Sequence, residues 1–357
     1  MSTRGRYRLP FQFAYVSNSL IPIRQTFYVQ INLNTVIYNE LTPVYCPKPY
    51  AENLGFTLKN ANRQHRGGEM IQNKVKWELP LFFLICYLLM CLCAVLYNLL
   101  GWHFFSINNL SFGPAILWFF MIFSPTISAL LLTYIFRGKE ATTNLLKNYI
   151  KFNVKWSWYL AAVALLLVPL LISLVLHLFG IGGGSGQDPD LTLASFFAWL
   201  IFNFFSGPFA EEAGWRGYAL PRLQAKYNSL IASLILGFFW ALWHVPLAFV
   251  IGADQAELGL FGWMIYTILI FTITIILTWL YNNTKGSLVV VILAHYFFNV
   301  GSNIVVNMFG LVNNMFYNIV GGIAGVIYLV IIIAGFGYKR FSKLKESEIP
   351  KLGKLAE

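Results

Sequence analysis

Eight long apolar runs follow residue 79, and no other feature of the sequence constrains the fold as strongly. They lie at about 79–101, 112–136, 157–180, 192–213, 229–251, 261–282, 287–309 and 314–337. Runs of about 20 apolar residues are long enough to cross the roughly 30 Å hydrocarbon core of a bilayer as helices. Only 11% of the 357 residues are charged, against roughly 25% in soluble domains. The sequence therefore predicts an all-α, polytopic transmembrane bundle of about eight helices.

Basic residues are confined to alternate connections between these runs. Lys and Arg occur before the first run, after every second run and after the eighth, whereas the other four connections contain none. Because Lys and Arg concentrate on the cytoplasmic side of membrane proteins, we expect a multi-pass protein of the cell membrane with both termini in the cytoplasm. The formal net charge of +11 is then explained by topology and lipid headgroups, so the expected partner is the lipid bilayer and not nucleic acid.

The two ends of the chain differ from its apolar part. Residues 1–77 are polar and basic without a sustained helical period, and we predict a poorly ordered N-terminal extension. Residues 78–340 are predicted to form the transmembrane domain, and 341–357 a cytoplasmic tail. Met70 precedes a short basic lead-in to the first run, so a natural start at Met70 is a further hypothesis. Mass spectrometry of the mature N-terminus tests it, and peptides from residues 10–60 would refute it.

Ionisable side chains are rare inside the apolar runs, and most of those present gather in three of them. The fourth run ends with Glu211 and Glu212, and Arg216 follows shortly after it. The fifth run contains His244, and the seventh contains His295 and Asn299. A charged residue at the centre of a membrane helix costs at least about 2.5–3.5 kcal/mol, so such residues are functional candidates. We therefore expect a site between the fourth, fifth and seventh helices.

Helical spacing separates these residues into groups. Glu212 and Arg216 are four apart, so they share a helix face and are expected to pair. Glu211 points about 100° away and is left without a cation, as suits a general base. A lone intramembrane His or Glu often serves only a helix–helix hydrogen bond. Two glutamates and two histidines together are instead the inventory of a water-activating hydrolase, with or without a metal.

These residues also form motifs. The string Glu211-Glu212-x-x-x-Arg216, an aromatic residue four before His244, and His295-x-x-x-Asn299 resemble the CPBP family of intramembrane proteases. That family includes CAAX prenyl endopeptidases of the Rce1 type and bacterial proteins linked to bacteriocin maturation or self-immunity. The resemblance covers about residues 190–310. One departure is that Trp240 stands where the family usually has Phe, which predicts a changed pocket wall.

The resemblance implies a role for each of the six residues. Glu211 would activate the attacking water with the assistance of His244, and His295 with Asn299 would stabilise the oxyanion. Glu212 and Arg216 would be structural. The implied function is that of an intramembrane endopeptidase acting on a peptide or protein substrate, at a peptide bond near the cytoplasmic face of the membrane.

The cofactor and the activity both have alternatives. The family carries the label of metalloprotease, and Glu211, His244 and His295 match a His₂Glu zinc set in type. The sequence lacks His-Glu-x-x-His, so we favour a metal-free glutamate mechanism and keep zinc open. A non-catalytic bacteriocin self-immunity or scaffold protein of the same fold is the second hypothesis. A transporter or proton relay is the third, but the sequence shows no matching broken helices in its two halves.

Overall fold

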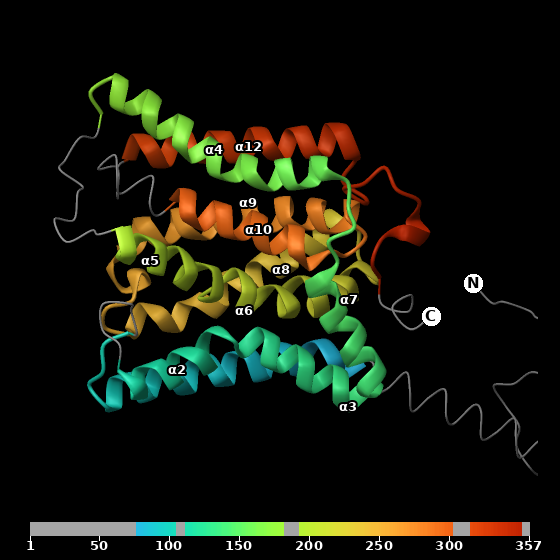
Figure 1. Ribbon diagram of the computed structural model, residues 1–357, viewed down its shortest axis with the longest axis horizontal. Helices are drawn as coiled ribbons and strands as arrows, with labels where there is room; N and C mark the ends of the chain where they lie inside the picture. The colour runs from blue at the N-terminus through green and yellow to red at the C-terminus, as the bar shows by residue number, and fades with distance from the viewer. Residues whose placement is uncertain (1–75, 105–110, 182–192, 303–314, 352–357) are drawn as a thin grey trace, which may run out of the picture. The chain divides into compact units, whose positions relative to one another are not determined.

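The computed structural model describes residues 76–104, 111–181, 193–302 and 315–351, and within these ranges the chain is helical with no strand (Figure 1). The membrane-length and shorter helices are Lys76–Leu99, α2 (Phe112–Ile122), α3 (Ser124–Lys147), α4 (Trp156–Leu178), α5 (Leu193–Phe205), α6 (Pro208–Glu212), α7 (Leu220–Gln224), α8 (Ser229–His244), α9 (Gly259–Asn283), α10 (Leu288–Val300) and α12 (Met315–Phe336). A π-helix, Ala213–Ala219, joins α6 to α7. The predicted all-α, multi-pass architecture is confirmed.

Five helices in the described ranges are long and apolar enough to cross a membrane: Lys76–Leu99, α4, α9, α12, and α8 with the 3₁₀ turn that follows it. They correspond to five of the eight predicted runs. The predicted run 112–136 is instead two helices, α2 and α3, bent by 57°. Pro125 explains the break, because its ring nitrogen carries no hydrogen to donate to the preceding turn. The end of the seventh run lies outside the described residues.

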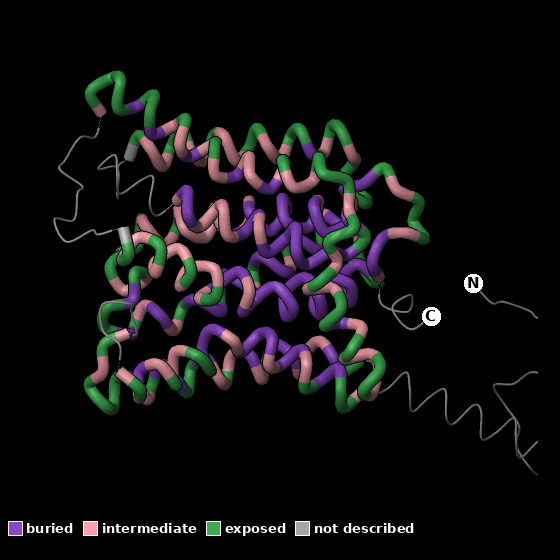
Figure 2. Tube along the Cα trace, in the orientation of Figure 1, coloured by how far each residue is buried: buried purple, intermediate pink, exposed green. Residues whose placement is uncertain are grey.

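The predicted run 192–213 differs most from the structure. It is broken between α5 and α6, where Gly207 and Pro208 begin a new helix. It then continues as the π-helix and α7, so the helical chain ends at Gln224 and not at Ala213. The predicted C-terminal boundary was wrong because it followed hydropathy, which falls at Glu211. The helical chain continues beyond that point, and all seven residues of the π-helix are buried. Figure 2 shows burial concentrated on these central helices, while α12 exposes its outer face.

This extension brings the predicted site residues to the same depth. Glu211 lies 13 residues before Gln224, or about 20 Å along a helix. His244 lies 15 residues after Ser229, the first residue of α8, or about 22 Å. The connection from Gln224 to Ser229 joins the two helices at one end, so both side chains lie at similar distances from that end.

The basic connections meet at the same end of the bundle. Nζ of Lys151 donates to the carbonyl oxygen of Lys285 at 2.6 Å, and Ser287 Oγ donates to the carbonyl oxygen of Lys151 at 2.7 Å. Lys285 also pairs with Glu348 at 2.7 Å. Figure 1 shows the end of α3, α7 and the C-terminal part of the described chain at this end. The cytoplasmic orientation of this end stays a prediction.

The segment after α12 packs back onto the bundle. Phe341 and Ile349 are buried, and Asn282 and Asn283 of α9 donate to the carbonyl oxygens of Arg340 and Phe341. Residues 341–351, part of the predicted tail, therefore belong to the folded domain. The predicted N-terminal extension lies outside the described residues, apart from Lys76 and Trp77.

Candidate active site

Glu211 is a buried carboxylate held by two indole groups. It lies in α6, and one of its oxygens, Oε2, accepts hydrogen bonds from Trp215 Nε1 at 3.2 Å and Trp240 Nε1 at 2.7 Å. Only 4% of the residue is exposed. No Lys, Arg or His in the described ranges forms an ion pair with it. The two indoles fix one oxygen of the carboxylate and leave the other, Oε1, for a different partner.

Glu212 faces the other way and forms the predicted ion pair. Its Oε1 accepts from Arg216 Nη1 at 2.8 Å, and both side chains are completely buried. The same oxygen contacts Nδ1 of His295 in α10, also at 2.8 Å. The Arg216 guanidinium lies 4.3 Å from the centre of the Trp240 ring. The pair therefore connects three parts of the chain and not only two turns of one helix.

The tautomers of the two histidines follow from their partners. His244 Nδ1 lies 2.9 Å from the carbonyl oxygen of Trp240, and a carbonyl only accepts, so this nitrogen carries the hydrogen. The Glu212 oxygen that His295 Nδ1 contacts also accepts from Arg216, so this nitrogen carries a hydrogen as well and donates it. When either ring is neutral, its lone pair is then on Nε2.

Asn299 and Glu211 converge on Gly207. A Cβ atom on Gly207 would lie 3.4 Å from Asn299 Nδ2 and 3.4 Å from Glu211 Oε1. The amide donor and the free carboxylate oxygen therefore face the same small space, which the missing side chain of Gly207 leaves open. His295 lies one turn earlier on α10, as its spacing from Asn299 predicted.

Trp240 contacts more of the predicted residues than any other side chain described here. Besides its contacts with Glu211 and Arg216, its ring lies 5.2 Å from that of His295 and 6.0 Å from that of His244. His244 joins the site through this residue. Sequence reasoning placed Trp240 in the pocket wall and missed its hydrogen bond, although an indole differs from the ring of Phe by having a donor.

Comparison with known proteins finds relatives for this part of the chain. Residues 193–301 match the family described as type II CAAX prenyl endopeptidase Rce1-like. This part of the chain is similar to Rce1-like proteins of the CPBP family. It is also 29% identical to CAAX prenyl protease 2 of Methanococcus maripaludis over 221 residues, which cover 53% of this chain and 79% of that protein. The Rce1-like domain contains all six predicted site residues, and its bounds agree with the 190–310 expected from the motifs.

The Rce1-like domain does not assemble the proposed zinc ligands. In the described ranges, no three His, Cys, Asp or Glu side chains are placed to hold a metal ion. His295 uses Nδ1 for Glu212, so only its Nε2 could bind a metal, and Glu211 Oε2 is occupied by the two indoles. The three side chains Glu211, His244 and His295 are not grouped closely enough to fit a zinc site.

A second buried charge cluster supports the Rce1-like domain from the basic end. Glu78, in the first helix, accepts from Arg222 Nε at 2.7 Å and from Arg137 Nε at 3.1 Å. One turn later, the Phe82 ring packs edge-on against Trp215, with ring centres 5.6 Å apart. The cluster therefore fixes the position of the first helix, whose Phe82 packs against Trp215, one of the two Trp residues that donate to Glu211. No motif in the sequence indicated it, because its members are more than 50 residues apart.

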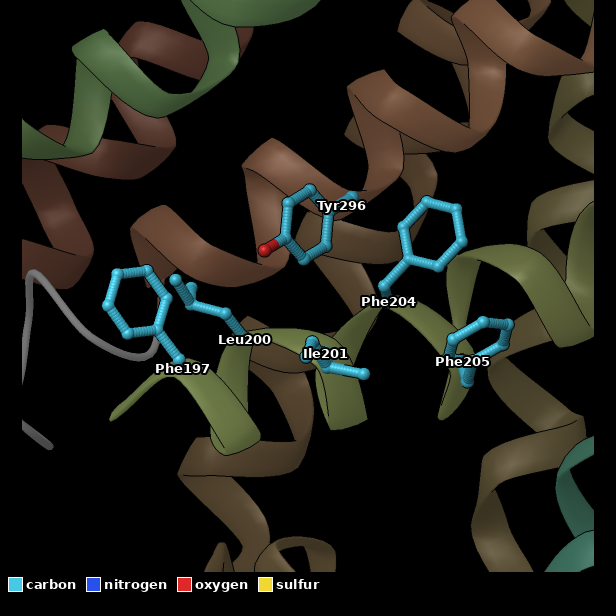
Figure 3. A pocket seen from close by; sticks show the side chains of 6 residues that line it. All are labelled: Phe197, Leu200, Ile201, Phe204, Phe205 and Tyr296. Carbon is cyan, nitrogen blue, oxygen red and sulfur yellow. The ribbon is translucent and has the colours of Figure 1, made fainter. Parts of the chain in front are cut away.

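An apolar groove of about 260 Å³ lies beside the site, between α5 and α10 (Figure 3). It is lined by Phe197, Leu200, Ile201, Phe204, Phe205 and Tyr296. Tyr296 follows His295 directly, and the Phe204 ring contacts that of Phe209 in α6, two residues before Glu211. The groove therefore leads from the outer surface of the Rce1-like domain toward the two helices that carry the site.

Proposed function

We propose that this protein is an intramembrane endopeptidase in which Glu211 activates water. The observation that carries the proposal is that the two oxygens of the buried Glu211 carboxylate have different surroundings. Trp215 and Trp240 hold Oε2, so Oε1 is free to accept a hydrogen bond from water in the space beside Gly207. In its ionised form, the Glu211 carboxylate can take a proton from that water.

In the proposed reaction, Glu211 takes one proton from the water as its oxygen forms a bond to the carbonyl carbon of the peptide. His244 Nε2 presents a lone pair and assists by accepting a hydrogen bond from the same water. The tetrahedral intermediate then collapses, the carbon–nitrogen bond breaks, and the proton held by Glu211 passes to the leaving amine. The products are a carboxylic acid and an amine, so atoms and charge balance.

We assign the oxyanion to Asn299 and His295. The Asn299 amide is a neutral donor and faces Glu211 Oε1, so it would lie beside the attacked carbonyl. His295 can donate only from a protonated Nε2, since Nδ1 already serves Glu212. The Glu212 carboxylate, 2.8 Å from Nδ1, is the counter-charge that a doubly protonated ring at this position would need. A donor of this kind contributes about 3 kcal/mol to the transition state. Glu212 and Arg216 thus act as a positioning pair.

The depth of Glu211 refines the proposed cleavage position. The sequence suggested a bond near the cytoplasmic face, but the helical extension to Gln224 supports a position about 20 Å from the basic end. We propose that the substrate is a membrane peptide whose apolar part enters along the groove between α5 and α10, with its scissile bond between Glu211 and Asn299.

Membrane-peptide proteomics tests the proposal. Cells carrying the wild type and Glu211→Gln are compared, with Glu140→Gln as the matched control because Glu140 is exposed and lies outside the site. We expect a set of membrane peptides that accumulates uncleaved only with Glu211→Gln. Identical profiles for all three would refute the protease and favour a non-catalytic self-immunity or scaffold role.

Metal analysis tests the metal-free form of the mechanism. The purified protein is assayed for zinc and treated with a chelator, with cleavage of a peptide found by the proteomics as the readout. We expect full cleavage after chelation. Stoichiometric zinc together with loss of cleavage on chelation would show that a metal is required.

A further inference from the structure

A polar cavity of about 610 Å³ lies at the basic end, away from the active site. It forms where the α7–α8 connection meets the segment that follows α12. Four basic side chains line it, Lys226, Lys339, Arg340 and Lys351, together with the carboxylate of Glu346. The proposed peptidase uses none of these residues.

The cavity lies at the level where two membrane helices end. Residue Ser229, which begins α8, lines it directly, and α12 ends at Phe336, two residues before the lining residue Tyr338. Tyr227 and Tyr338 both line the cavity and are each 46% exposed. Tyr side chains are enriched where helices leave the hydrocarbon core. In a bilayer, this level is occupied by lipid headgroups.

The lining carries an excess of positive charge. Lys351 is neutralised by Glu346, with Nζ 2.5 Å from the carboxylate oxygen. Lys226, Lys339 and Arg340 have no carboxylate partner in the described part of the chain, and all three are exposed. Three unpaired cations around one cavity favour an anionic ligand.

The frame that carries these cations is rigid. The backbone N–H groups of Ser229 and Leu230 donate to the carbonyl oxygens of Lys339 and Tyr338, at 2.9 and 3.2 Å. The buried Asn282 amide donates to the carbonyl oxygen of Arg340 at 2.8 Å. These bonds use the first donors of α8, so a ligand here must be held by side chains. Because the backbone is fixed, only the side chains of the cations lose freedom on binding.

We propose that this cavity binds the phosphate of an anionic phospholipid headgroup, with Lys226, Lys339 and Arg340 as the cations that hold it. The position at the helix ends, the flanking Tyr side chains and the net positive lining all match that ligand. The site is independent of the proposed peptidase reaction, since none of its residues contacts Glu211 or the histidines.

The test uses the full-length protein in a nonionic detergent. It is titrated with phosphatidylglycerol, phosphatidylcholine or inorganic phosphate, and bound molecules are counted by native mass spectrometry. Phosphatidylglycerol is expected to bind more tightly than phosphatidylcholine. Each cation near an anionic headgroup raises the binding affinity roughly fivefold. The triple variant Lys226→Gln/Lys339→Gln/Arg340→Gln should therefore bind phosphatidylglycerol roughly a hundredfold more weakly than the wild type.

The control variant removes the same charge from the same end of the bundle. Lys139→Gln/Lys147→Gln/Lys155→Gln changes three exposed lysines outside the cavity and is expected to bind phosphatidylglycerol as the wild type does. Equal weakening by the two triple variants, or equal binding of the two lipids by the wild type, would overturn the proposal. Inorganic phosphate that displaces the lipid at equal concentration would instead indicate a soluble ligand and also overturn it.

A second variant keeps the test decisive if the triple variant does not fold. Arg340 also donates to the carbonyl oxygen of Leu344 at 3.4 Å, so its loss could loosen the segment after α12. The double variant Lys226→Gln/Lys339→Gln leaves that bond intact and should bind phosphatidylglycerol about 25-fold more weakly than the wild type. Unchanged binding in this double variant would refute the assignment.

Discussion

Replacing Trp240 with Phe removes one hydrogen-bond donor and keeps an aromatic ring in place. The lost bond joins Nε1 to Glu211 at 2.7 Å, inside the protein. A hydrogen bond to a charged group contributes about 1.5–3 kcal/mol. The Arg216 guanidinium, 4.3 Å from the ring centre, would also lose part of a contact that contributes about 0.5–1 kcal/mol. We expect Trp240→Phe to lower the free energy of unfolding by about 2–4 kcal/mol.

Trp243→Phe is the matched control for this substitution. Trp243 is equally buried on the same helix, but its Nε1 donates to the neutral hydroxyl of Ser124 at 3.0 Å. A neutral hydrogen bond contributes only about 0.5–1.5 kcal/mol. Unfolding of both variants in mixed detergent micelles should therefore show a larger loss of stability for Trp240→Phe, by about 2 kcal/mol from the midpoints of the two ranges.

A double-mutant cycle with Glu211→Gln isolates the bond itself. If the charged acceptor strengthens the hydrogen bond, the effects of Trp240→Phe and Glu211→Gln should be non-additive by about 1 kcal/mol. Since Phe is the residue that the CPBP family usually has here, cleavage should fall but remain measurable in Trp240→Phe. Additive effects, together with equal losses for Trp240→Phe and Trp243→Phe, would refute the view that Trp240 positions the carboxylate.

Three further outcomes are expected. Glu78→Gln leaves two arginines, one buried and one half-buried, without their shared carboxylate. In the same unfolding assay, it should lower the free energy of unfolding by about 3 kcal/mol or more, and an unchanged value would show that the cluster is dispensable. Gly207→Ala fills the space between the Glu211 carboxylate and the Asn299 amide and should reduce the rate of cleavage at least about tenfold. The control Gly321→Ala, whose added methyl group meets nothing within 4 Å, should leave that rate unchanged. Unaltered cleavage in Gly207→Ala would exclude that space as the position of the attacking water. Lys285 lowers the pKa of Glu348 below its ordinary value of 4.5, so this pair stabilises the segment after α12 above that pH, and the contribution is lost as pH falls through the lowered pKa. The hydrogen-exchange protection of residues 342–351, relative to the intrinsic exchange rate at each pH, should therefore fall with acid in the wild type. A Glu348→Gln variant whose protection falls as steeply would contradict this.

Apolar length was the most informative property of the sequence for the fold. It located five helices within a few residues, because a stretch that must satisfy all its backbone hydrogen bonds in lipid has little choice but a helix. It failed where packing against protein replaced contact with lipid. The π-helix from Ala213 to Ala219 contains two glycines and an arginine, yet it is entirely buried, and hydropathy carries no information about that kind of burial.

Helical spacing predicted part of the site correctly. The four-residue separation of Glu212 and Arg216 predicted their ion pair, since such contacts depend only on the local helix. The contact between Glu212 and His295 joins residues 83 positions apart, and the bond from Trp240 to Glu211 joins two helices. Those contacts depend on tertiary packing, which spacing within one helix does not determine. The catalytic roles of Glu211, His244, His295 and Asn299 stay predictions.

The segment after α12 has a practical consequence for producing this protein. A shortened form that stops at Phe336, the end of the last membrane helix, would remove the acceptors of several amide side chains. Asn282 donates to the carbonyl oxygen of Arg340, Asn283 to that of Phe341, and Gln224 to that of Pro350 at 3.4 Å. Each of these amides keeps another acceptor inside the bundle but would lose one hydrogen bond, and each lost bond costs stability. Purification tags therefore belong after residue 351, and trimming the chain at the membrane boundary would yield a less stable product.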